Sequence, residues 1–178
     1  MAMNNKFSAL AVLALVIGLT TGTAPGAAKA DDPAFISAGA GWFDFNRKKD
    51  DGAEFRLDYR HDKKFWVFKP FATVAAASNG MTFLGAGVLI DVYFGRRWVL
   101  TPSFAPTWWR GKTDDLDLGH ALEFRSQLEL AYRFDNRSRL GISISHSSNA
   151  SLGDSNPGTE TLLVNYSIPL DHFGKMFR

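Results

Sequence analysis

The sequence predicts an all-β fold class: an eight-stranded antiparallel up-and-down transmembrane β-barrel, preceded by a cleavable signal peptide. Three observations support this prediction. Apolar and polar residues alternate along several segments, turn residues separate eight such segments, and large aromatic residues gather near the segment ends. A strand with one face in lipid and the other in a polar lumen must alternate in this way, whereas an amphipathic helix repeats about every 3.6 residues.

Residues 1–30 have the three parts of a secretory signal peptide. Lys6 supplies the positive charge, and residues 9–19 form an apolar run that is too short to span a bilayer, which needs about 20 residues. Small residues at the two ends of 28–30 suit cleavage. We therefore expect the mature chain to begin at Asp31 and to form one domain, an outer-membrane β-barrel over residues 31–178.

Composition narrows the classes of function. The formal net charge of +2 comes from basic residues dispersed among nearly as many acidic ones, which argues against a nucleic-acid binder. The chain has no cysteine, so neither disulfides nor thiol chemistry are expected, and no ligand spacing suggests a metal site. Aromatic residues make up 13% of the chain and favour strands, and beyond the signal peptide no segment is apolar enough for a transmembrane helix.

The alternation is clearest in two segments. In residues 54–60 every odd position is apolar and every even position is charged, and in residues 122–134 the even positions are, with one exception, large and apolar. The lumen of an eight-stranded barrel is just wide enough for side chains to fill. We therefore expect no pore but a buried, mutually paired polar plug formed by Glu54, Arg56, Asp58, Arg60, Glu123, Arg125 and Glu129. A substrate should therefore bind at the outer surface of the barrel and not in the lumen.

Turn residues divide the chain into the expected strands 34–46, 53–61, 67–78, 82–94, 98–110, 119–134, 138–148 and 159–170. Their connectors are tight at 95–97 and 135–137, but longer and polar at 111–118 and 149–158. Outer-membrane barrels combine short periplasmic turns with long external loops in this manner. Two aromatic girdles are expected: Phe65, Trp66, Tyr93, Phe94, Trp98, Tyr132 and Phe134 on the periplasmic side, and Trp42, Phe43, Trp108 and Trp109 on the external side.

Polar residues interrupt the apolar face of the last two expected strands. The even positions from 140 to 144 are apolar, and His146 and Ser148 continue the same parity. Glu160 begins the apolar face of the final strand. Because an ionisable group beside hydrocarbon is costly, such residues are candidates for function.

These three side chains are also expected to lie close together. His146 and Ser148 are two residues apart on one strand, so their Cα atoms lie about 6.5–7 Å apart on one face. The hairpin should bring position 146 opposite or diagonal to position 160. A serine beside a base that is oriented by an acid is activated for acyl transfer. We therefore predict Ser148 as nucleophile, His146 as general base and Glu160 as the orienting acid, near the external leaflet.

At these residues the chain resembles the lipid A 3-O-deacylase (PagL) family of outer-membrane β-barrels. The resemblance is carried by His-Ser-Ser-Asn-Ala at 146–150 and Asn-Pro-Gly-Thr-Glu at 156–160, and it extends loosely over the whole expected barrel. It implies an esterase that hydrolyses the 3-O-linked acyl chain of lipid A in the outer leaflet of a Gram-negative outer membrane. It implies the same roles for Ser148, His146 and Glu160, and no cofactor.

The resemblance also implies an oxyanion hole formed by polar residues of the last loop. Asn149 and Asn156 are the side chains that would contribute, with the backbone amide of Ala150 or Gly153. The expected partners are lipopolysaccharide, through its lipid A, and outer-membrane lipid, whereas association of two copies into a homodimer is left open. Basic residues in or beside the expected external loops could attract lipopolysaccharide phosphates, although each alone is more simply a solvated loop residue: Arg47, Lys48, Lys49, Arg110 and Lys112.

Two other functions fit part of the pattern. One is a non-enzymatic structural or adhesive outer-membrane barrel, in which the external loops rather than the wall would matter. The other is a soluble eight-stranded barrel that carries a lipid inside, with its apolar parity turned inward. The clustering of aromatic residues at both ends argues against the soluble barrel.

Overall fold

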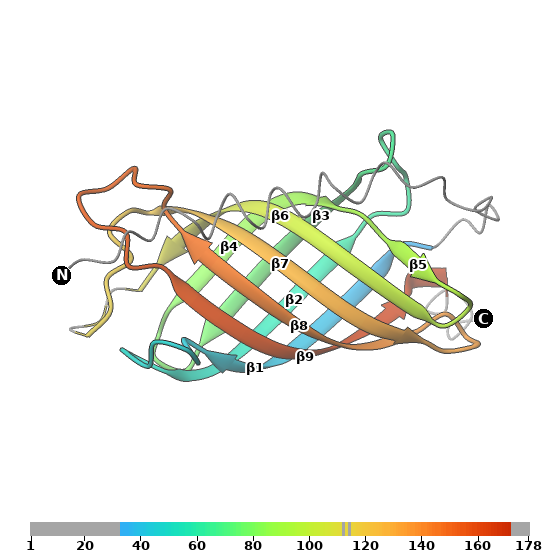
Figure 1. Ribbon diagram of the computed structural model, residues 1–178, viewed down its shortest axis with the longest axis horizontal. Helices are drawn as coiled ribbons and strands as arrows, with labels where there is room; N and C mark the ends of the chain where they lie inside the picture. The colour runs from blue at the N-terminus through green and yellow to red at the C-terminus, as the bar shows by residue number, and fades with distance from the viewer. Residues whose placement is uncertain (1–32, 112, 114, 172–178) are drawn as a thin grey trace. The chain divides into compact units, whose positions relative to one another are not determined.

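The computed structural model describes residues 33–111, 113 and 115–171, which form a β-barrel (Figure 1). The expected signal peptide and Lys112 lie outside the described residues. The strands are β1 (Phe35–Phe43), β2 (Gly52–Arg60), β3 (Lys69–Ala77), β4 (Thr82–Leu89), β5 (Val92–Phe94), β6 (Trp98–Arg110), β7 (Leu122–Arg133), β8 (Arg139–Ser148) and β9 (Thr159–Pro169). No helix in the described part of the chain is long and apolar enough to cross a membrane.

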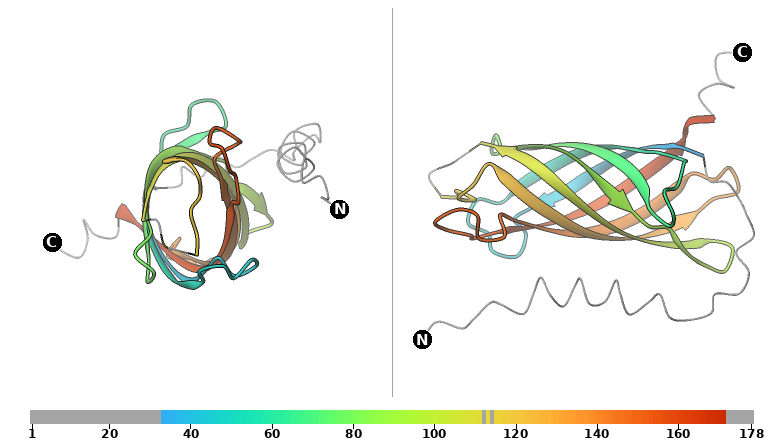
Figure 2. Two further views of the ribbon diagram at one scale, coloured as in Figure 1. Left: turned by 90° about the vertical axis from the view of Figure 1, so that its left-hand side faces the viewer. Right: turned by 90° about the horizontal axis from the view of Figure 1, so that it is seen from above.

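All strand pairs are antiparallel, and the sheet closes because β1 pairs with β9 and β4 pairs with β6. Figure 2 shows the resulting ring of strands around a lumen. The predicted eight-stranded barrel is confirmed, although the fourth expected strand is interrupted at Ile90 and Asp91. Ile90 donates its N–H to the Pro102 carbonyl at 3.0 Å, but Pro102 has no N–H to return. Since the register with β6 is the same on both sides, β4 and β5 form one wall strand.

Side chains alternate between the lumen and the outer wall. Every second residue of β8 is buried, whereas Leu140, Ile142 and Ile144 between them are exposed on the outside. The same alternation with apolar residues outward holds along β2 and the later part of β9. The outer wall is therefore the apolar surface that lipid requires, and the soluble barrel with its apolar parity inward is excluded.

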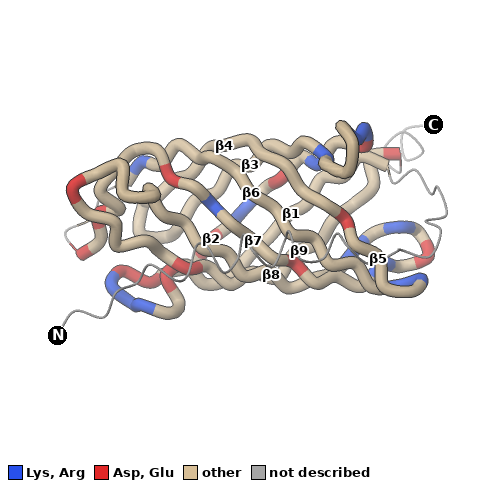
Figure 3. Tube along the Cα trace, turned by 45° about the horizontal axis from the view of Figure 1, so that its top comes forward, with Lys and Arg blue, Asp and Glu red and all other residues tan. Residues whose placement is uncertain are grey.

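The predicted polar plug fills the lumen, and its seven charged residues are all 6% exposed or less. Arg60 binds Glu129 across the barrel with two hydrogen bonds, of 2.6 and 3.1 Å, and Arg56 donates to Glu54 and Gln127. The mutual pairing is incomplete, because the buried Glu123 carboxylate accepts no hydrogen bond from the residues that the structure describes. In Figure 3 charged positions occur along the strands between the barrel ends as well as in the connectors.

The two ends of the barrel differ. Residues 44–51, 78–81, 111–121 and 149–158 connect strands at one end, which we call the loop end, and residues 61–68, 95–97 and 134–138 connect them at the other, the terminal end. The lumen at the loop end is closed by an apolar cluster of Phe43, Ala75, Ala77, Met81, Phe83, Trp109, Leu116 and Leu118. The segment that contains the last two of these crosses the mouth of the barrel in Figure 2.

This cluster corrects one expectation about the external girdle. Phe43 and Trp109 were expected at the lipid interface, but they are 0% and 7% exposed and point into the lumen. Their odd positions on β1 and β6 have inward parity, whereas the neighbouring Trp42 and Trp108 face outward and are exposed. Whether an aromatic residue lies in the girdle or in the lumen therefore depends on its parity along the strand. Its aromatic character alone does not predict its position.

Candidate active site

His146 and Ser148 lie at the loop end of β8, and Glu160 lies at the beginning of β9. The register of these strands places His146 directly opposite Glu160. All three side chains have outward parity, and all three are half-buried beside exposed apolar neighbours. The structure therefore brings the three predicted residues together on the outer wall.

One hydrogen bond joins two of them: His146 Nδ1 lies 3.0 Å from Glu160 Oε1. An ionised carboxylate only accepts hydrogen bonds, so Nδ1 carries the proton and Nε2 is left as the acceptor of the neutral ring. Among the described residues no hydrogen bond joins Ser148 to this ring. Contacts between nucleophile and base often tighten only when substrate is bound.

Gly158 fixes the other side of the His146 ring. Its φ of +64° is in the left-handed region, and a Cβ at this position would lie 2.9 Å from His146 Cε1 and 3.1 Å from the Ser147 carbonyl oxygen. Glycine is the residue that adopts this φ without strain and leaves room for the His146 ring. The sequence analysis placed this residue in the polar connector 149–158, and its packing against the ring was not predicted.

The two asparagines of the last loop have different surroundings. Asn149 is fully buried, and its Nδ2 donates to the carbonyls of Leu118 at 2.8 Å and Ser155 at 2.7 Å. Both of its amide hydrogens are therefore used to fasten segment 149–158 to the neighbouring loop. Asn156 is exposed, and its Oδ1 accepts the Asn149 backbone N–H at 3.1 Å.

Two residues of the loop between β1 and β2 also contact the site. Arg47 Nε lies 3.4 Å from Glu160 Oε2. Asp44 is buried, and its Oδ1 accepts the Thr159 hydroxyl at 3.1 Å. The sequence analysis did not connect either residue with Glu160, because only the pairing of the first strand with the last brings these distant segments together.

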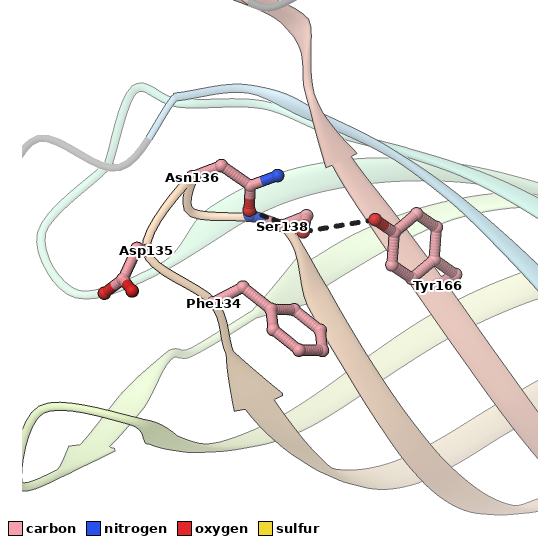
Figure 4. Close-up of a pocket in the computed structure, with 5 residues that line it drawn as sticks. All are labelled: Phe134, Asp135, Asn136, Ser138 and Tyr166. Atoms are coloured by element: carbon pink, nitrogen blue, oxygen red, sulfur yellow. Dashed lines mark hydrogen bonds between the residues drawn. The ribbon is translucent and has the colours of Figure 1, made fainter.

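The three site residues lie half-buried on the outer wall. A surface hollow lies at the terminal end, lined by Phe134, Asp135, Asn136, Ser138 and Tyr166 (Figure 4). There Tyr166 donates to Ser138 at 3.2 Å, and Ser138 donates to Asn136 at 2.7 Å. This hollow is at the opposite end of β8 from His146, so it does not belong to the site. No group of three metal-ligating side chains occurs in the described residues.

Comparisons with known proteins agree with this fold. The crystal structure of the outer membrane enzyme PagL is 22% identical, covers 77% of this chain and 100% of its own, and gives a TM-score of 0.62. A de novo designed transmembrane β-barrel is 8% identical, covers 80% of this chain and 98% of its own, and gives a TM-score of 0.54. No curated protein matches the chain. The family model of the lipid A 3-O-deacylase PagL matches residues 34–169, from the first strand to the last. The chain therefore belongs to the lipid A 3-O-deacylase (PagL) family.

Proposed function

We propose that this protein removes the 3-O-linked acyl chain of lipid A, with Ser148, His146 and Glu160 as its catalytic triad. The observation that carries the proposal is the 3.0 Å hydrogen bond between His146 and Glu160 on a mostly apolar wall. Polar and charged groups are costly on a lipid-facing surface and occur there mainly for function. Membership of the family supplies the substrate class.

The geometry suits hydrolysis through an acyl-enzyme. The Ser148 hydroxyl attacks the ester carbonyl carbon while His146 Nε2 takes its proton, and Glu160 stabilises the imidazolium through Nδ1–H. When the tetrahedral intermediate collapses, the bond to the sugar oxygen breaks, and His146 returns the proton to that oxygen. Water, deprotonated by the same ring, then attacks the carbonyl carbon of the acyl-serine. The bond to Ser148 Oγ breaks, His146 returns the proton to Oγ, and the fatty acid is released.

Donors for the developing oxyanion come from the segment after β8. The Asn156 amide group is exposed, and none of the described hydrogen bonds uses its NH₂ group or the backbone N–H of Ala150. Asn149 is less suited to this role, because its side-chain donors are both occupied. We assign the oxyanion hole to Asn156 and the Ala150 amide, and we assign Asn149 to holding their loop.

The loop end is proposed to face the exterior, with the site in the external leaflet. The connectors 111–121 and 149–158 at this end are long and polar, and those at the terminal end include the tight turns 95–97 and 134–138. Lipid A resides in the external leaflet, so its ester reaches Ser148 without leaving the membrane. The exposed side chains of Lys49 and Arg110 could attract its phosphates.

The experiment compares Ser148→Ala with Ser147→Ala. Ser147 is an adjacent serine that is buried on the lumen side, so it is a matched control for the loss of a hydroxyl. We expect lipid A from cells with the wild type or Ser147→Ala to lose one acyl chain by mass spectrometry, and lipid A from Ser148→Ala cells to stay intact. Full activity of Ser148→Ala excludes the triad. Intact lipid A with the wild type excludes the deacylase and leaves a structural or adhesive barrel.

A further inference from the structure

We infer that Arg47 is a positioning residue of this site, holding one oxygen of Glu160 while the other binds His146. The inference rests on the proposed function. Arg47 Nε lies 3.4 Å from Oε2, and His146 Nδ1 lies 3.0 Å from Oε1 of the same carboxylate. The carboxylate is thus held from both sides, in a chain of contacts that ends beside Ser148.

Glu160 Oε2, the oxygen that does not bind His146, lacks a hydrogen-bond donor among the described residues. The side chain is 16% exposed, and Oε2 is a buried atom. A carboxylate held through Oε1 alone can rotate about its terminal bond, whose torsional preference is broad. The guanidinium attracts Oε2 and so resists a rotation that would carry Oε1 away from His146.

The loop holds Arg47 in this place. Asp44 has a φ of +51°, and its carbonyl accepts the Lys48 N–H at 2.9 Å while its Oδ2 accepts the Lys49 N–H at 2.8 Å. Its other carboxylate oxygen binds Thr159, the residue before Glu160. One buried aspartate therefore shapes the turn around Arg47 and fastens it to β9.

The far side of this loop is fastened as well. The Asn79 side chain donates to the Asp50 carbonyl at 2.9 Å, and Trp42 Nε1 donates to Asp51 at 2.8 Å. In addition, the Phe45 N–H donates to the Glu160 carbonyl at 3.2 Å. Arg47 is thus presented by a loop that is bound on both sides, which reduces the entropy lost when its side chain meets Glu160.

The neighbouring cation provides a control. Lys48 Nζ lies over the Trp42 ring, 5.2 Å from its centroid, and is not among the described ion-pair partners of Glu160. If basic residues of this loop act only by attracting lipid A phosphates, losing either one should raise KM. A residue that positions Glu160 should instead lower kcat, because its contribution is made through the catalytic base.

The test measures kcat and KM of Arg47→Gln, Arg47→Lys and Lys48→Gln in detergent micelles, on lipid A and on lipid A from which the phosphates have been removed. We expect Arg47→Gln to lower kcat about three- to tenfold on both substrates with KM unchanged, since the pair is partly exposed. Arg47→Lys should restore part of the rate because it keeps the charge, and Lys48→Gln should keep the wild-type kcat.

A double-mutant cycle decides whether Arg47 acts through Glu160. In the Glu160→Gln background, Arg47→Gln should cause no further loss, whereas independent roles would give multiplicative losses and overturn the inference. A rise in KM alone, or a loss confined to the phosphorylated substrate, would overturn it too. The altered mobility of unheated protein in SDS gels confirms that each variant is folded.

Failure of the proposed function gives a different result. If the wild type releases no acyl chain from lipid A, the deacylase is excluded, and the reaction of Ser148 with a fluorophosphonate probe still tests Arg47. Arg47→Gln must then slow this labelling about three- to tenfold, and Lys48→Gln must leave it unchanged. Equal labelling rates for all three proteins would refute the positioning role.

Discussion

Gly158 lies directly against the His146 ring, with space for a hydrogen but not for a methyl group: a Cβ there would come 2.9 Å from Cε1. Gly158→Ala should therefore push the ring away from its position beside Glu160 and lower kcat about 10- to 100-fold, as small displacements of catalytic groups do. Initial rates of acyl-chain release, measured on protein refolded in micelles, check this expectation.

Gly95→Ala is the control for this substitution. Gly95 has almost the same backbone conformation, with φ +62° against +64°, but no atom lies within 4 Å of a Cβ built on it. Alanine should cost each position about 1–2 kcal/mol of backbone strain, so Gly95→Ala reproduces the strain of Gly158→Ala without its close contacts. If Gly95→Ala loses as much activity as Gly158→Ala, strain rather than contact with His146 is responsible.

Glu160→Gln tests whether the charge of the acid is needed. The amide has the shape of the carboxylate, but it can present its NH₂ group to Nδ1 and favour the wrong tautomer of His146. We expect kcat to fall about 10²- to 10⁴-fold, the range for the third member of a triad, with the barrel equally stable. Asp154→Asn, in the exposed part of the last loop, should retain wild-type kcat. A Glu160→Gln enzyme with an unchanged rate would remove Glu160 from the triad.

The sequence predicted the strands well because a two-residue period and turn residues are local signals. The outward placement of His146, Ser148 and Glu160 followed from the same period, since parity along a strand fixes the face. The interruption of the fourth strand could not be predicted from the sequence of that strand alone. It arises from Pro102 on the neighbouring strand, which lacks the N–H that would complete the ladder.

Contacts that depend on closure of the barrel were not predictable in the same way. Asp44 and Thr159 are 115 positions apart, and only the register between the first and last strands brings them together. Arg47 consequently resembled any solvated loop cation. Asn149 was assigned by resemblance to its motif, but its surroundings include Leu118 of another loop, whose path no local pattern indicates.

Substitutions of Asn149 and Asn156 should have different effects, the first mainly on stability and the second mainly on catalysis. Asn149→Ala removes the donors to two carbonyls, of Leu118 and Ser155, and should lower the free energy of unfolding by about 1–3 kcal/mol. Asn156→Ala removes one acceptor, that of the Asn149 backbone N–H, so it should lower stability less, by about 0.5–1.5 kcal/mol, and it should lower kcat about 10²- to 10³-fold, as loss of an oxyanion donor does. Urea unfolding in micelles and rates on lipid A measure the two effects. The reverse pattern would move the oxyanion role to Asn149.

Arg60 and Glu129 provide a test of the lumen that is independent of the site. Their side chains are joined by two hydrogen bonds across the barrel and are almost completely buried. Glu129→Leu leaves Arg60 with Asp58 alone, 3.6 Å away, and Arg60→Met leaves Glu129 and Asp58 as buried carboxylates without this partner. Each change should cost about 3–5 kcal/mol of stability, and the double variant should recover part of the loss, because Asp58 still lacks Arg60. Activity per folded molecule should stay at the wild-type value in all three, because the reaction takes place on the outer wall. Additive losses of stability in urea unfolding would mean that the two side chains do not pair. A loss of specific activity would mean that the lumen takes part in the reaction.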